Sequence, residues 1–218
     1  MSTGPDRKLE LRRLGRTRYD AVHALQQELL VERIEGRVGD VLLFTEHEPV
    51  VTLGRKSPAN DAGGVDVPIV VVERGGEATY HGPGQVVGYP IVYLPEQRRD
   101  LHKYLRDLEE VVIRALGDFD VPAGRKEGLT GVWIGRKKVC SLGVAVRRWV
   151  TWHGFALNVN TDLDAFRSFN PCGLDPDVMT RLADHVDRDL ALDEVEMRLL
   201  VRFAEVFEYR EVLDTTVD

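Results

Sequence analysis

Hydrophobic and polar positions alternate with two different periods along this chain, and the two periods predict both strands and helices. Short apolar runs rich in β-branched residues, typical of buried strands, occur at 41–44, 50–54, 68–72 and 86–94. Apolar residues three and four positions apart instead predict a helix that follows Thr17, a second over 101–116 and a third around 193–206. The mixture predicts an α+β fold.

Polar residues at the expected helix ends support these assignments. Thr17 and Asp20 have the spacing of a capping box, and Asp100 can cap the second helix. Asp193 and Glu194 would lie in the first turn of the third helix, where negative charge favours the helix dipole. The apolar stripes of all three helices are therefore expected to pack against strands.

A run of three further strands is expected between the second and third helices. Residues 128–134 and 137–146 flank a Gly135-Arg136 turn of the hairpin type, and 150–158 continues the pattern. Small residues alternate along one face of the middle strand, at Ser141, Gly143 and Ala145. Such a face leaves room for another group to lie against it.

Composition and charge narrow the class of protein. The chain has 218 residues, of which 43% are hydrophobic, enough for one domain with a sizeable core. The formal net charge of −7 argues against a nucleic-acid-binding protein. Residues 1–8 contain no apolar secretion signal, and no apolar run has the length of a membrane span. We expect a cytoplasmic protein with a disordered tail at 1–8 and one domain over 9–218.

The cysteines and histidines do not form a metal-binding pattern. Cys140 and Cys172 are not part of a C-x-x-C pair, and a disulfide between them would be unexpected in a reducing cytosol. The six histidines are scattered, and none lies at metal-ligand spacing from another. We therefore predict no metal site and no cofactor.

The most informative stretch runs from Arg74 to Gln85, R-G-G-E-A-T-Y-H-G-P-G-Q, between two predicted strands. Four glycines in twelve residues let the backbone approach a ligand and direct N–H groups toward a carbonyl, carboxylate or phosphate. Glycine clusters also occur in plain turns. An arginine, a histidine and a glutamine in one such stretch favour a binding role.

Cys172 is the candidate nucleophile, because it lies in a Pro-Cys-Gly segment rather than in an apolar strand such as the one that holds Cys140. Gly173 leaves room for a substrate carbonyl and can present an N–H to an oxyanion. A thiol needs an activator, which can be a histidine, a helix N-terminus or a lysine. Lys138, at the head of a buried strand, is one such group. The structural alternatives are an inert loop cysteine and a surface lysine at a hairpin end.

Four motifs occur in the order found in lipoyl(octanoyl) transferases, and the chain resembles that family from about Gly15 to Tyr209. They are the stretch from Arg74 to Gln85, then K-V-C-S-L-G from Lys138, H-G-F-A-L-N from His153, and P-C-G around Cys172. The family is the cofactor-independent branch of the biotin and lipoate protein ligase superfamily. The resemblance implies a single α+β domain with mixed sheets flanked by helices. It also implies that 9–218 is the octanoyltransferase catalytic domain.

The resemblance implies an acyltransferase with a Cys/Lys dyad. Cys172 would take the octanoyl group from octanoyl-acyl carrier protein as a thioester. Lys138 would lower the pKa of that thiol and later act as general base. A lysine on a lipoyl domain of a 2-oxoacid dehydrogenase complex, or of the glycine cleavage H protein, would then receive the acyl group, the first step of protein lipoylation.

The resemblance also places the substrate against three segments. The residues that would line the acyl chain are Arg74, Gly75, Gly76, Glu77, Ala78, Thr79, Tyr80, His81, Ser141, Leu142, Gly143, Gly154, Phe155 and Ala156. Glu77 places a charge where the motif is permissive, and Cys140 occupies a small-residue position. We expect a monomer that binds neither nucleic acid nor membrane.

Two other functions remain open from the sequence. An ATP-dependent lipoate or biotin protein ligase would need no cysteine, but its glycine loops read S-G-G-G or G-R-G-R-x-G-R, which this chain lacks. A non-catalytic scaffold that binds lipoyl domains would not depend on Cys172. A papain-like protease is less consistent, since only His185 follows Cys172.

Overall fold

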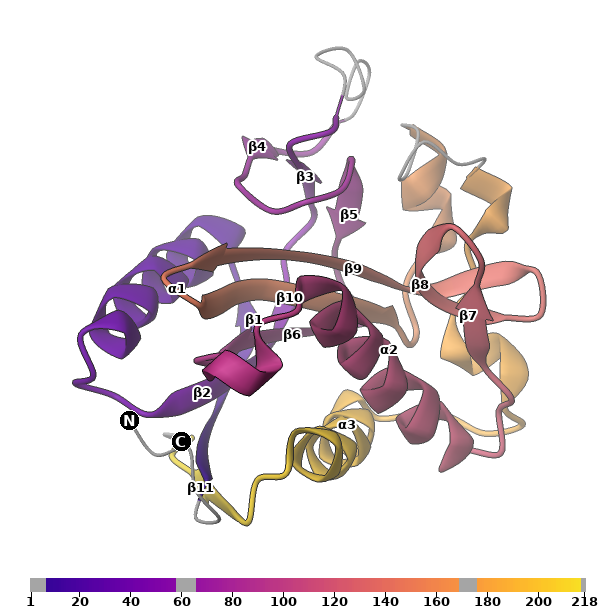
Figure 1. The fold of residues 1–218 in the computed structure, drawn as a ribbon. Helices are drawn as coiled ribbons and strands as arrows, with labels where there is room; N and C mark the ends of the chain where they lie inside the picture. Colours follow the sequence, from indigo (N-terminus) through magenta and orange to yellow (C-terminus); the bar gives the residue numbers. More distant parts are fainter. Residues whose placement is uncertain (1–6, 58–65, 169–175, 217–218) are drawn as a thin grey trace.

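The fold is built on an eight-stranded mixed sheet, and a smaller three-stranded sheet stands above it in the view of Figure 1. A computed structural model describes residues 7–57, 66–168 and 176–216. From edge to edge the large sheet contains β11 (Glu211–Asp214), β1 (Lys8–Thr17), β2 (Asp40–His47), β6 (Gln85–Ile91), β10 (Val150–Asn158), β9 (Lys137–Arg147), β8 (Leu129–Ile134) and β7 (Gly124–Lys126). The small sheet contains β4 (Ile69–Val71), β3 (Val50–Leu53) and β5 (Thr79–His81).

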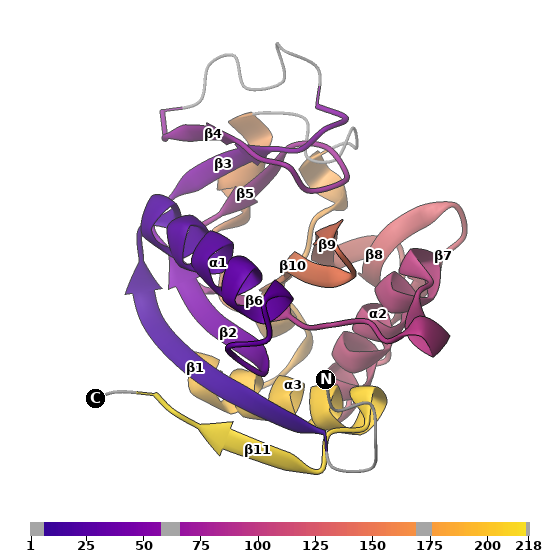
Figure 2. The same ribbon diagram turned by 60° about the vertical axis from the view of Figure 1, so that its left-hand side comes forward.

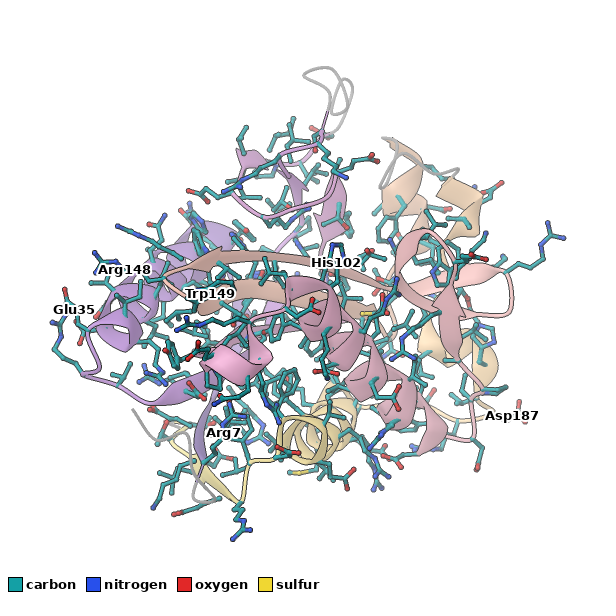
Figure 3. All side chains as sticks on the ribbon, viewed as in Figure 1. Arg7, Glu35, His102, Arg148, Trp149 and Asp187 are labelled. Atoms are coloured by element: carbon teal, nitrogen blue, oxygen red, sulfur yellow. The ribbon has the colours of Figure 1, made fainter. Side chains whose placement is uncertain are left out.

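Strand direction divides the large sheet into two parts. β1 runs parallel to both β2 and β11, whereas all pairs from β2 to β7 are antiparallel. Arg148 and Trp149 form the tight turn between β9 and β10, with φ angles of 49° and 62° (Figure 3). A positive φ at both central residues is the geometry of a type I′ hairpin turn.

Helices cover both faces of the large sheet, as the views in Figures 1 and 2 show. α1 (Tyr19–Ile34) lies on one face, where Val22, Leu29 and Leu30 join a core with residues of β2, β6 and β10. α2 (Leu101–Gly117) and α3 (Leu192–Phe207) pack together on the other face over the larger core. All nine residues of β10 are buried because this strand is covered on both sides.

The α+β class, with mixed sheets flanked by helices, is confirmed, and so are the three long helices. Asp100 caps α2 as predicted, since its carboxylate accepts from the backbone N–H of Lys103 at 3.0 Å. The predicted capping box of α1 is wrong. Arg18 is the N-cap and makes no side-chain capping bond, and Thr17 stays in β1, where its hydroxyl lies 2.7 Å from that of Thr45.

Three features of the fold differ from what the sequence predicts. Arg7 and Lys8, assigned to the disordered tail, are ordered: Arg7 donates to Asp40 at 3.1 Å, and β1 begins at Lys8. β4 is an exposed edge strand rather than a buried one, and Val71 is 78% exposed. The glycine-rich stretch contains the short strand β5, because Thr79–His81 pairs with β3.

Among the described residues, none of the helices combines the length and the apolar character needed to cross a membrane.

Candidate active site

Arg74 fastens the glycine-rich stretch to the small sheet. Its buried guanidinium donates to the carbonyl and the hydroxyl of Thr52 at 2.9 and 2.8 Å, and to the carbonyl of Glu77 at 2.8 Å. The arginine therefore fixes the shape of the loop between β4 and β5. A charged donor makes such bonds stronger than a neutral one would.

A small residue on β9 lets this loop approach the large sheet. A Cβ atom on Gly143 would lie 2.9 Å from both Cδ of Arg74 and the carbonyl oxygen of Gly75, closer than side chains tolerate. The backbone N–H of Gly75 donates to the carbonyl of Val144 at 3.0 Å. The alternation of small residues on β9 thus provides the surface on which the loop lies.

An open pocket lies between the loop, β9 and β10. Its lining residues are Tyr19, Arg74, Gly76, Glu77, Thr79, His81, Tyr89, Ser141, Leu142, Gly143, His153, Gly154, Phe155 and Ala156. Three segments distant in sequence therefore meet at one cavity.

Most residues expected to line a substrate are in this wall, but three are not. Gly75 is bonded to β9 through its backbone, Ala78 belongs to the core of the small sheet, and Tyr80 packs edge-on against Phe166 at 5.5 Å between ring centroids. In the short strand β5, buried Thr79 and His81 line the cavity while Tyr80 faces the small core.

Tyr19, Tyr89 and His153 line the pocket but were absent from the predicted set. Tyr19 lies at the start of the helix that the sequence predicts after Thr17, and the apolar spacing of that helix gives no sign that it faces a cavity there. His153 had a signal, because it begins the H-G-F-A-L-N motif. Its backbone has a φ of 55°, an uncommon conformation for a histidine within a strand.

The histidines around the pocket are held neutral. Burial lowers the pKa of His81 well below its usual value and that of His153 to about 3, and neighbouring histidines and Arg74 act in the same direction. Burial also lowers the pKa of His47, whose Nε2 lies 2.8 Å from the hydroxyl of Tyr89, to about 4. The cavity wall is thus polar without carrying imidazolium charge.

Hydrogen bonds connect the pocket wall to the strand that carries Lys138. Nδ1 of His81 lies 3.2 Å from the amide oxygen of Gln85, whose amide nitrogen donates to Asn158 at 2.9 Å. Asn158 donates to the carbonyl of Thr180 at 3.0 Å, and the N–H of Thr180 donates to the carbonyl of Lys138 at the same distance. Gln85 and Asn158 belong to two of the sequence motifs, and this series of hydrogen bonds gives both residues a structural role.

Lys138 is buried, with 3% of its surface exposed, so the alternative of a surface lysine at a hairpin end does not hold. It occupies space that Gly131 leaves open: a Cβ atom on Gly131, where φ is 140°, would lie 2.6 Å from Cε of Lys138. The buried carboxylate of Glu109 accepts from the N–H of Gly131 at 3.0 Å and from Arg106 and Arg125 at 2.7 and 3.1 Å. Glu109, which sequence assigned to no role, therefore holds the strand opposite Lys138.

Of the two cysteines, only Cys140 belongs to the described residues. Cys140 is fully buried in the core, as expected, and burial raises the pKa of its thiol. Cys172 lies outside the described residues. On either side of residues 169–175, η2 (Leu163–Ser168) and η4 (Pro176–Val178) are joined by an ion pair of 3.4 Å between Arg167 and Asp177.

The chain is similar in sequence and in fold to known proteins. The chain is 44% identical over 206 residues to an octanoyltransferase of Solibacter usitatus, covering 91% of this chain and 93% of the relative. It is 44% identical over 208 residues to an octanoyltransferase of a Nostoc species, covering 93% and 94%. A bipartite lipoate protein ligase from Thermoplasma acidophilum shares the fold, with a TM-score of 0.73, 21% identity, and 98% and 88% of the chains covered. Residues 18–204 match the model of the lipoyl protein ligase A/B catalytic domain, and the chain belongs to that family.

Proposed function

We propose that this protein transfers an octanoyl group from octanoyl-acyl carrier protein to a lysine of a lipoyl domain, the first step of protein lipoylation. The observation that carries the proposal is the pocket, whose walls come from three of the sequence motifs. Support also comes from the relatives named octanoyltransferase, which align along nine-tenths of the chain. The Thermoplasma ligase is described with its E2 lipoyl domain, which is consistent with an acceptor of that kind.

The pocket offers a suitable environment for an acyl chain. Leu142, Phe155 and Ala156 supply apolar surface, and Ser141 lies in the same wall. Burial of about six methylenes at about 0.8 kcal/mol each gives roughly 5 kcal/mol of binding. One methylene changes such binding by about 1–3 kcal/mol, so discrimination between chain lengths is gradual.

In the proposed first step, the thiolate of Cys172 attacks the thioester carbonyl of the donor. A new C–S bond forms, the C–S bond to the carrier breaks, and the carrier leaves as a thiol after taking a proton from Lys138. Lys138 suits this role because it is buried at a fixed position, with its backbone carbonyl held by Thr180. Thr180 lies eight residues after Cys172 in the chain.

In the second step, the ε-amine of the acceptor lysine attacks the acyl-enzyme. An amide C–N bond forms, the C–S bond to Cys172 breaks, and Lys138 accepts the proton that the amine loses. The reaction consumes no ATP, since the energy of the donor thioester is retained in the acyl-enzyme. One chain supplies both groups, and we propose that the protein acts as a monomer.

The direct test is intact mass after incubation with octanoyl-acyl carrier protein in the absence of ATP. We expect one octanoyl adduct on the wild-type protein and on Cys140→Ser, and none on Cys172→Ser. Addition of a lipoyl domain should then move the octanoyl group to that domain. Lys138→Met, which keeps the length of the buried side chain, should slow adduct formation by about 10²- to 10⁴-fold.

Two results would overturn the proposal. An adduct that forms equally on Cys172→Ser would exclude the acyl-enzyme, and a lipoyl domain acylated only when ATP is present would indicate a ligase of the kind that the fold also accommodates.

A further inference from the structure

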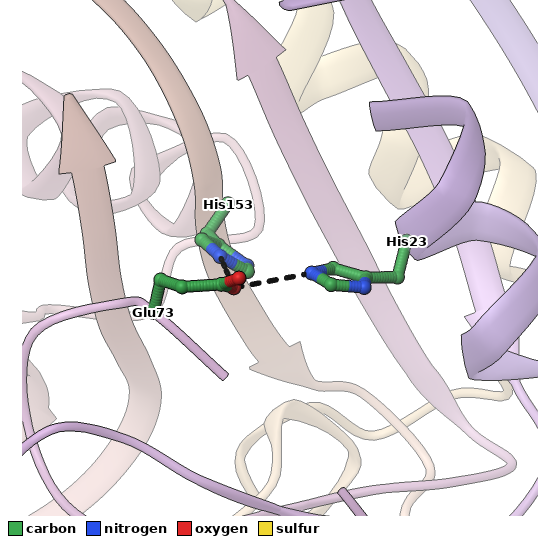
Figure 4. A group of neighbouring side chains, drawn as sticks. All are labelled: His23, Glu73 and His153. Carbon is green, nitrogen blue, oxygen red and sulfur yellow. Dashed lines mark ion pairs between the residues drawn. The ribbon is translucent and has the colours of Figure 1, made fainter. Parts of the chain in front are cut away.

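Three side chains that can ligate a metal meet beside the pocket, and each comes from a different element (Figure 4). His23 projects from α1, Glu73 follows β4, and His153 lies on β10. Nε2 of His23 lies 3.4 Å from a carboxylate oxygen of Glu73, and Nε2 of His153 lies 4.0 Å from the same oxygen. The three ligand atoms all lie within 4.8 Å of one another.

The hydrogen-bonding capacity of this cluster is unfilled within the described part of the chain. His153 is 1% exposed, and neither of its ring nitrogens has a hydrogen-bond partner there. The same holds for Nε2 of His23, whose contact with Glu73 is an ion-pair distance only. A buried polar atom without a partner costs about 1–3 kcal/mol, so a ligand that fills this capacity would stabilise the cluster.

The surrounding rings hold both imidazoles in place. His153 stacks on Trp152 at 4.3 Å between centroids, and His23 stacks on Trp152 and on His153 at 5.7 Å each. Figure 4 shows the carboxylate of Glu73 lying between the two imidazole rings.

We propose that His23, Glu73 and His153 form a binding site for a divalent transition-metal ion, with zinc the best fit. Two imidazoles and one carboxylate are a common zinc ligand set, and three protein ligands leave a fourth position open. Ligand atoms about 2.0–2.2 Å from a tetrahedral ion lie about 3.3–3.6 Å from each other. The separation of 3.4 Å between His23 and Glu73 already has this value. Glu73 is half exposed and can move the short distance that His153 requires.

The bound ion would join α1, the glycine-rich loop and β10 beside the pocket. Glu73 immediately precedes Arg74, which shapes the loop, and His153 lines the cavity. The sequence led us to expect no metal site, because the three residues are separated by 50 and 80 positions, 73 minus 23 and 153 minus 73. Only the folded chain brings them together, and neither member of the proposed Cys/Lys dyad is among the three.

Zinc binding by the full-length protein tests the proposal. All samples should carry Cys172→Ser, since a reactive thiolate would bind zinc by itself. Equilibrium dialysis against buffered Zn²⁺, with metal measured by mass spectrometry, should give one zinc per chain. Glu73→Gln and His23→Ala should each weaken zinc binding by at least about tenfold. His102→Ala removes an exposed histidine of α2 and is the matched control, for which we expect no change.

Cobalt gives a second measurement on the same samples. Co²⁺ in a tetrahedral site with nitrogen ligands should show intense visible absorption, and Glu73→Gln should abolish it. Far-UV circular dichroism of each variant establishes that it is folded, and Glu73→Gln is the safer change because its side chain is half exposed. Absence of stoichiometric zinc at micromolar concentrations, or equal binding by Glu73→Gln and the control, would overturn the proposal.

Discussion

The protein buries polar groups in two contrasting ways. Around Asp40, every carboxylate oxygen is used: Arg33 and the N–H of Tyr93 donate to one oxygen at 2.8 and 2.9 Å, and Arg7 and Tyr209 donate to the other at 3.1 and 2.7 Å. Around His153, ring nitrogens are buried without hydrogen-bond partners in the described chain. The first cluster joins α1 and β2 to the residue before β1, the segment after β6 and the segment between α3 and β11. The second borders the pocket. Complete pairing marks a structural centre, and incomplete pairing marks a place where a ligand is expected.

The largest effect should follow from breaking the Asp40 cluster. Asp40→Ala removes the carboxylate that accepts from Arg33 and from the buried hydroxyl of Tyr209, and one of the acceptors of Arg7. We expect a loss of about 3–5 kcal/mol in the free energy of unfolding. Urea unfolding measures this loss. The control is Asp107→Ala, which removes a partner of exposed Lys103 and should change stability by about 1 kcal/mol or less. Similar losses for the two variants would contradict the structural role of Asp40.

A smaller effect is expected at Gly131, whose N–H donates to the buried carboxylate of Glu109 and which lies against Lys138. Gly131→Ala places a methyl group against Cε of Lys138 in a backbone conformation that suits glycine. We expect a loss of about 1–3 kcal/mol in stability, together with slower acyl transfer because Lys138 is displaced. Gly124→Ala, a change on β7 where a Cβ atom meets nothing within 4 Å, is the control in the same assays. Full activity of Gly131→Ala would show that the position of Lys138 is not critical.

The sequence predicts the helices and strands of these regions better than the side-chain contacts between them. Periodicity located α2, β6 and β8 but not β7, which directly follows α2. An apolar stripe gives no reason to bury Glu109, whose partners Arg125 and Gly131 are distant in sequence. Tyr19 and His23 fall within the helix predicted after Thr17, but the sequence gives no sign that one end of that helix faces a cavity. The order of the sequence motifs predicts most residues of the pocket wall. Tyr80 is an exception, because it lies in the strand β5, and a strand directs alternate side chains to opposite sides.

Two buried histidines near the pocket, His153 and His47, should make the protein sensitive to acid. The folded-state pKa of His153 is about 3 and that of His47 about 4, both below the usual 6.5, so the unfolded chain binds protons that the folded protein does not. Stability from these groups is complete above pH 6.5 and is lost as pH falls toward 3. The slope is up to about 1.4 kcal/mol per pH unit for each histidine.

His153→Asn tests this contribution, because asparagine tolerates the left-handed backbone at this position. We expect the loss of stability between pH 6.5 and 4.5, measured by urea unfolding at several pH values, to be smaller for His153→Asn than for the wild type. His102→Ala should keep the wild-type slope. An unchanged slope in His153→Asn would assign the acid sensitivity to other groups.

The smallest effect should come from Glu73 in the absence of metal. Its side chain is half exposed and its contacts with the two histidines are long, so Glu73→Gln should change the free energy of unfolding by no more than about 0.5 kcal/mol. Thermal unfolding in the presence of a chelator measures this difference. A large loss would mean that Glu73 is part of a paired structural centre like that of Asp40.

The position of β1 between β2 and β11 has a consequence for synthesis on the ribosome. β2 emerges soon after β1, but the residues that pair with the other edge, Glu211–Asp214, are translated more than 190 positions after Thr17, 211 minus 17 being 194. One edge of β1 therefore stays without its partner strand for most of translation. An unpaired edge can associate with other chains. Nascent chains stalled before β11 should therefore aggregate more readily than released ones.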